Sequence, residues 1–68
     1  MNRRLRSLEL MSAMQPFLQG GVITPKNCRE IVEDFVKGSS EKLRSFIFSP
    51  DIPMQYSGCV SKLNDFIQ

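Results

Sequence analysis

The chain has 68 residues, of which 41% are apolar and 24% charged, and its formal net charge is +2. This balance predicts one small globular domain over residues 1–68 and excludes a disordered chain. Two cysteines and no histidine exclude a secreted disulfide scaffold and the common zinc sites.

The first predicted element is a helix over residues 3–19. Its apolar residues follow one another at spacings of three or four, which is the period of a helix face. This broad apolar face consists of Leu5, Leu8, Leu10, Met11, Ala13, Met14, Phe17 and Leu18. Pro16 removes a backbone donor, so we expect the helix to kink or stop near Gln15. Gly20 or Gly21 supplies the left-handed residue that ends many helices.

The second predicted helix, over residues 25–37, has the clearest signals. Thr24 is a good N-cap, and Pro25 fits the first helical position, where a missing N–H has no penalty. Gly38 is expected to end the helix. Its apolar stripe consists of Cys28, Ile31, Val32, Phe35 and Val36. Its charged face contains two pairs of opposite sign at i,i+4 spacing, Arg29–Glu33 and Glu33–Lys37.

A short third helix is predicted after the turn that follows Gly38. Ser39 or Ser40 is expected to cap it, and proline at position 50 stops it, because the residue before a proline avoids helical angles. Its apolar face consists of Leu43, Phe46 and Ile47. The helix is expected to have about three turns at most.

The fourth predicted helix extends from about Pro53 to Ile67, with its apolar residues again at helical spacing. Gly58 disfavours helix by about 1 kcal/mol relative to alanine. The helix therefore has an alternative start at Ser57, which leaves residues 50–56 as an extended connector. No segment shows sustained strand alternation, so the sequence predicts an all-α bundle of four helices with short connections.

Enzyme chemistry is not expected from these residues. Cys28 lies in a first helical turn beside Arg29, a position that favours thiolate, but a buried core cysteine is the stronger interpretation. Cys59 has the same interpretation, and a bridge to Cys28 remains an alternative. The acidic cluster of Glu30, Glu33 and Asp34 is interpreted as a solvated helix face. We expect no catalytic residue, no cofactor, no metal and no small-molecule substrate.

Nucleic-acid binding is an alternative function, because the second and third helices resemble a helix-turn-helix pair. The candidate contacts are Arg3, Arg4, Arg6, Lys42 and Arg44. Two features count against this alternative. Asp34 stands where close packing of the two helices normally needs a small side chain, and both helices are neutral overall, whereas DNA binding depends on cations.

Protein association is the function that the sequence favours. A small core without metal or disulfides is expected to gain stability from a second chain, and methionine adapts to irregular binding surfaces. The predicted contacts on the first helix are Leu10, Met11, Met14, Phe17 and Leu18. We therefore expect a small non-enzymatic regulatory or adaptor protein that self-associates or binds an obligate protein partner.

The basic start of the chain is not followed by the apolar run of an export signal, so we expect a cytoplasmic protein. No stretch approaches the ~20 apolar residues of a membrane span. Attachment of the first helix to a membrane surface is disfavoured, because its three cations lie at one end and Pro16 interrupts it.

Overall fold

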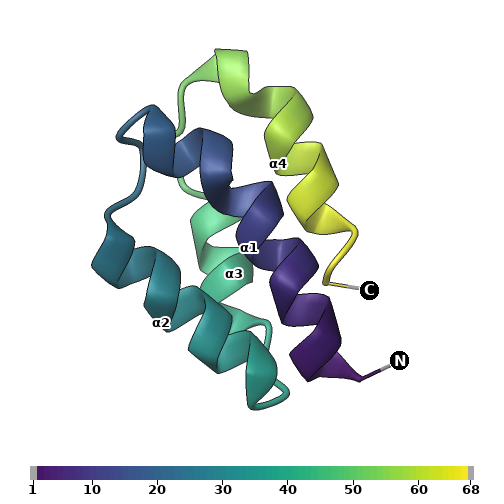
Figure 1. Ribbon diagram of the computed structural model, residues 1–68. Helices are drawn as coiled ribbons and strands as arrows, with labels where there is room; N and C mark the ends of the chain where they lie inside the picture. The colour runs from purple at the N-terminus through teal and green to yellow at the C-terminus, as the bar shows by residue number, and fades with distance from the viewer. Residues whose placement is uncertain (1, 68) are drawn as a thin grey trace.

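The structure is a computed structural model that describes residues 2–67, and within this range it is all-helical. Its elements are α1 (Arg3–Gln19), α2 (Pro25–Val36), α3 (Glu41–Ile47), the 3₁₀ helix η1 (Met54–Tyr56) and α4 (Ser57–Asn64). The predicted bundle of four helices, with the third one short, is confirmed (Figure 1).

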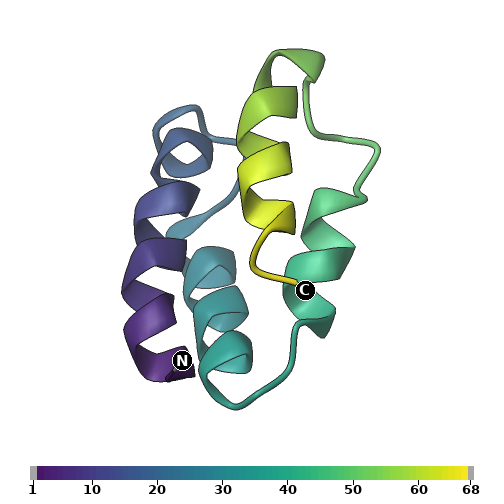
Figure 2. The same cartoon turned by 90° about the vertical axis from the view of Figure 1, so that its right-hand side faces the viewer.

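The helices form two layers. Figure 2 shows α1 and α2 on one side of the molecule and α3 and α4 on the other. Each helix packs against two others: α1 contacts α2 and α4, and α3 contacts α2 and α4 as well. The outer surface of the first layer faces the viewer in Figure 1. No helix among residues 2–67 lies over that surface.

The core lies between the layers and is lined by one stripe of α1. Ser7, Leu10, Met14 and Phe17 are the buried residues of this helix, at spacings of three and four. The Phe17 ring packs edge-on against Phe46 at 5.1 Å and stacks on Tyr56 at 5.4 Å, so the end of α1 is joined to α3 and η1. The buried Ser7 hydroxyl donates to the Arg4 carbonyl at 2.6 Å.

The first helix spans residues 3–19 as predicted, and of the two effects expected from Pro16 the stop near Gln15 does not occur, because α1 continues through Pro16 to Gln19. Phe17 is fully buried one residue after the proline, and its packing holds the last turn in helical conformation. The carbonyl that Pro16 leaves without a helical donor belongs to Ser12, on the exposed side of the helix. The predicted left-handed residue is Gly21, with φ 71°.

The second helix begins as predicted. The Thr24 side-chain oxygen accepts a hydrogen bond from the Asn27 N–H at 3.1 Å, and Gly38 follows the helix with φ 102°. The helix itself ends at Val36, one residue earlier than predicted. The two expected i,i+4 ion pairs do not form: within residues 2–67, ion pairs shorter than 4.0 Å join only Arg6 to Glu9 and Lys42 to Glu30.

The third helix is fixed at its start by side chains that precede it. Ser40 occupies the N-cap position without a capping bond from its side chain, whereas the Ser39 hydroxyl accepts from the Glu41 N–H at 3.2 Å. Asp34 of α2 accepts from the Lys42 N–H, also at 3.2 Å. The carboxylate that the sequence analysis counted against helix packing therefore ties α2 to the first turn of α3.

The fourth helix is shorter than the longer of its two predictions, and it starts at Ser57, the alternative start. The predicted extended connector over residues 50–56 is wrong: Pro50 and Asp51 form a turn, Pro53 has extended backbone angles, and Met54–Tyr56 forms η1. After Asn64 the chain continues in i,i+3 turns, in which the N–H of Phe66 donates to the Leu63 carbonyl at 3.0 Å. These tighter bonds replace the last predicted turn of the helix.

Candidate functional site

The five predicted partner contacts on α1 divide into two groups. Leu10, Met14 and Phe17 are fully buried among the helices of this chain, so a partner that docks on the folded protein does not reach them. Met11 is exposed, and Leu18 is half-buried. The helix α1 has two neighbouring apolar strips. Because the strip that contains Phe17 is buried in the core, the strip that contains Met11 stays on the protein surface.

This outer strip belongs to a surface with exposed apolar residues on both helices, which we call the α1–α2 face. It consists of Leu5, Leu8, Met11 and Leu18 on α1 and of Val32 and Val36 on α2. Leu5 is 62% exposed, Leu8 63% and Met11 44%. Between the two helices the face contains a hollow of about 320 Å³ with Met11, Leu18 and Val32 in its lining. Two leucines and one methionine exposed on the same helix of a small protein indicate a binding surface.

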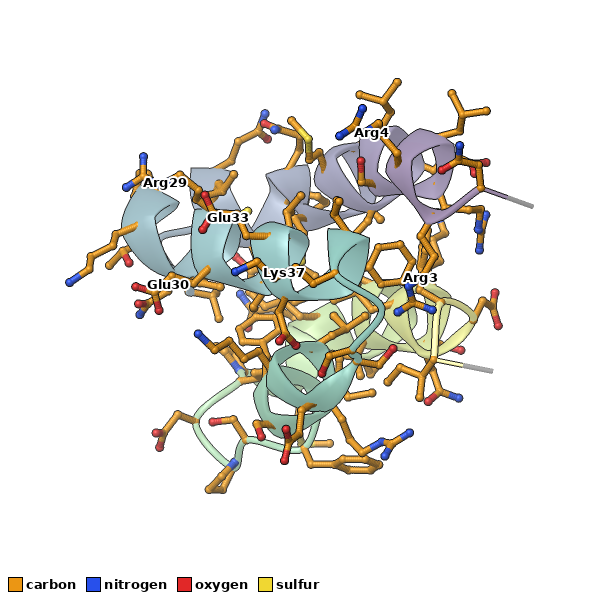
Figure 3. The ribbon with its side chains drawn as sticks, turned by 90° about the horizontal axis from the view of Figure 1, so that it is seen from below. Arg3, Arg4, Arg29, Glu30, Glu33 and Lys37 are labelled. Carbon is orange, nitrogen blue, oxygen red and sulfur yellow. The ribbon has the colours of Figure 1, made fainter. Side chains whose placement is uncertain are left out.

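The three arginines at the start of α1 do not form one basic patch. Arg3 donates from Nε to the Phe35 carbonyl at 2.7 Å, and its guanidinium lies 4.1 Å from the centre of the Phe35 ring. A second nitrogen donates to the Ser39 carbonyl at 3.2 Å and to the Ser40 hydroxyl at 3.1 Å. Figure 3 shows Arg4 on the opposite, outer side of α1.

Arg6 is also held against the protein. It forms an ion pair with Glu9 at 2.8 Å, and its guanidinium lies 4.3 Å from the centre of the Phe66 ring. The five predicted nucleic-acid contacts are thus divided, with Arg3 and Arg6 packed on aromatic rings, Arg4 on the outer side of α1, and Lys42 and Arg44 on α3. The structure does not gather them into a single basic surface.

The two cysteines are free thiols. Cys28 is buried and Cys59 half-buried, and no bridge joins them. Burial raises the pKa of the Cys28 thiol above its ordinary value of 9.0. The cause is loss of hydration, and its direction is opposite to the thiolate-favouring effect expected from the first helical turn and Arg29. The buried interpretation of Cys28 therefore fits the structure better than a reactive thiol.

A second surface feature is a groove between α2 and α3, about 710 Å³ in volume, which the sequence analysis missed. We call it the α2–α3 groove. Its apolar lining consists of Val22, Ile23, Ile31, Phe46 and Ile52, and its charged lining of Glu30, Asp34, Glu41, Lys42 and Asp51. The predicted acidic cluster is divided between two sides of α2. Figure 3 shows Glu30 on the side towards α3 and Glu33 on the outer side.

The sequence signal for this groove was the i,i+4 spacing of Glu30 and Asp34, which places both on one side of α2. Its other carboxylates come from later segments, so no single-helix pattern contains the set. Within residues 2–67, no three carboxylates or thiols lie close enough to hold a metal ion. The carboxylates therefore line the groove at separate places and do not converge on one point.

Comparisons of the chain with family profiles, with curated proteins and with solved structures find no match. Among residues 2–67, no helix combines the length and apolar character that crossing a membrane requires. What the protein does is therefore argued from its own surfaces, the α1–α2 face and the α2–α3 groove.

Proposed function

We propose that this protein acts by binding protein chains, as a small non-enzymatic regulator or adaptor, and that it pairs with a second copy of itself. The observation that carries the proposal is the exposure of Leu5, Leu8 and Met11 on α1, with Met11 lining a hollow that it shares with Val32 of α2. Covering apolar surface stabilises a complex by about 25 cal/mol per Å² removed from water. Burial of a leucine of this face against a partner is therefore favourable relative to its exposure to water.

A second copy suits this face for geometric reasons. A stable interface buries about 800 Å² per partner, roughly a sixth of this chain's 4683 Å² of accessible surface. In a two-fold dimer each chain contributes the same face to the interface. Neither copy of the face then stays exposed, so association stops at the dimer.

DNA binding is the weaker proposal. The helix pair that resembles a helix-turn-helix, α2 and α3, has carboxylates along the groove between its members. Phosphate is repelled by that charge, and Arg3 and Arg6 already have partners within the chain. No feature of the described surface favours nucleic acid over protein.

The test is the substitution Leu8→Glu, with Met54→Glu as the matched control. Both residues are exposed, but Met54 lies on η1, outside the α1–α2 face, and is 91% exposed. In a two-fold dimer each substitution acts twice, so we expect Leu8→Glu to weaken dimerisation at least about 100-fold. Light scattering after size exclusion measures the mass of each variant, and circular dichroism checks that the helices are retained.

The native chain and Met54→Glu are expected at twice the chain mass, and Leu8→Glu at the mass of one chain. A native chain that remains a monomer at high protein concentration contradicts self-association. Equal loss of the dimer in both variants contradicts the assignment to the α1–α2 face.

A further inference from the structure

We propose that the α2–α3 groove binds a basic, amphipathic peptide segment of a partner protein. This inference goes beyond self-association and does not depend on it, because the groove and the α1–α2 face have no lining residue in common. Three properties of the groove lead to this occupant, namely its apolar floor, the charge along its sides and the separation of its carboxylates.

The floor of the groove is apolar and partly open. Ile23 and Ile31 belong to the buried core, whereas Val22, Phe46 and Ile52 are only half-buried and keep apolar surface at the groove. The volume of about 710 Å³ lies within the range of sites that hold ligands. An apolar side chain of a partner that enters the groove therefore gains the usual stabilisation of burial.

The charge of the groove is opposite to that of the rest of the chain. Four carboxylates and the Lys42 ammonium line it, a net side-chain charge of −3. The remaining eight cations and three carboxylates of the sequence give +5 elsewhere. Although the whole chain is basic, this hollow attracts cations and repels anions, and charged walls around a low-dielectric floor strengthen the attraction.

The charges are placed for a chain with several cations, not for one ion. Glu30 and Asp34 come from α2, Glu41 from α3 and Asp51 from the connector after it. Because no three of them converge, a single cation satisfies one or two at a time. In a peptide with basic residues on either side of an apolar one, the basic residues can contact the separate carboxylates while the apolar residue contacts the floor of the groove.

The lysine already in the groove does not block such a partner. The Lys42 ammonium lies 3.9 Å from the nearer carboxylate oxygen of Glu30, and both side chains are about half exposed. That distance is longer than a hydrogen bond, and an ion pair of this exposure is worth at most about 1 kcal/mol. An arginine from a partner replaces this contact with a forked, charge-assisted one.

The experiment uses fluorescence anisotropy with a labelled amphipathic Leu/Lys peptide of about 11 residues, or three helical turns. A Leu/Glu peptide of the same length and spacing tests for charge, and unlabelled spermine as competitor tests for a small polyamine. We expect the Leu/Lys peptide to bind and to weaken with added salt. Tighter binding of the Leu/Glu peptide, or of spermine, overturns the proposal.

The groove is located by two double variants that remove the same charge. Glu41→Gln with Asp51→Asn neutralises two exposed carboxylates of the groove, neither of which accepts a side-chain hydrogen bond within residues 2–67. Glu33→Gln with Asp65→Asn neutralises two exposed carboxylates outside it. We expect the first pair to raise the dissociation constant about 5-fold, and the second less than about 2-fold.

Equal weakening by both double variants overturns the proposal, because the peptide then responds only to net charge. The measurement is repeated on Leu8→Glu, which lacks the proposed dimer contact. Unchanged peptide binding in that variant is expected. Loss of peptide binding there overturns the assignment to the groove, whereas loss of the dimer alone bears only on the proposed function.

Discussion

At the start of α1, one arginine side chain completes the end of another helix. The last carbonyls of a helix lack intrahelical donors and carry partial negative charge, so a cation beside them is stabilising. Arg3 donates to the carbonyls of Phe35 and Ser39 and covers the Phe35 ring. The guanidinium thus joins α1 to the end of α2, over 32 positions of sequence.

We expect Arg3→Gln to lower the free energy of unfolding by about 1.5–3 kcal/mol, because it removes charge-assisted bonds to partly buried carbonyls. Arg4→Gln is the matched control, since Arg4 is exposed on the outer side of α1, and a change within about 0.5 kcal/mol is expected. Urea titrations of both variants give these values. An equal effect of the two variants means that the chain responds to net charge and not to the Arg3 contacts.

The role of Arg3 was not predictable from the sequence. A run of arginines looks the same whether its members face solvent or a neighbouring helix, and the partners of Arg3 belong to a distant segment. From the sequence, Arg3, Arg4 and Arg6 are therefore equivalent candidates for contacts with nucleic acid. The fold separates them because successive residues on a helix point about 100° apart.

At the scale of the elements, local signals predicted best where several of them agree. For α2 the cap, the proline at the first position, the apolar period and the closing glycine all indicate the same helix. For α1, Pro16 alone indicated an early end, and the packing of Phe17 on Phe46 and Tyr56 overrides it. The end of α4 was also missed, because a change from α-helical to tighter turns has no clear residue signature.

Replacement by alanine is expected to change stability in opposite directions at two glycines, one inside a helix and one just after a helix. Gly58 lies inside α4, and a Cβ built there meets nothing within 4 Å, so Gly58→Ala should raise the free energy of unfolding by about 0.5 kcal/mol. Gly38 has φ 102° after α2, so Gly38→Ala should lower it by about 1–2 kcal/mol. Thermal unfolding of both variants measures the two shifts, and a stabilised Gly38→Ala contradicts the backbone conformation at that turn.

At the scale of the whole molecule, the sequence predicted the bundle but not which apolar strip faces inward. Two neighbouring strips of α1 are apolar, one containing Leu10 and Phe17 and the other Leu8 and Met11. Periodicity shows that both exist and cannot choose between them. The choice depends on where α3 and α4 pack, and it leaves the second strip as the proposed binding face. The α2–α3 groove likewise exists only once both helices are placed.

Unfolding of the whole molecule exposes Cys28, whose raised pKa makes stability depend on pH. In the folded chain burial disfavours the thiolate, so the pKa lies above 9.0, whereas in the unfolded chain the thiol ionises near its ordinary value. Below that value the thiol is neutral in the folded and the unfolded chain, so its ionisation does not lower the free energy of unfolding. As the pH rises above it, ionisation favours the unfolded chain and stability falls.

Urea midpoints from about pH 8 to about pH 10.5 measure this loss. We expect a shallower loss in Cys28→Ala than in the native chain and in Cys59→Ala, since other groups titrate alike in all three. The same slope in all three chains contradicts a raised Cys28 pKa.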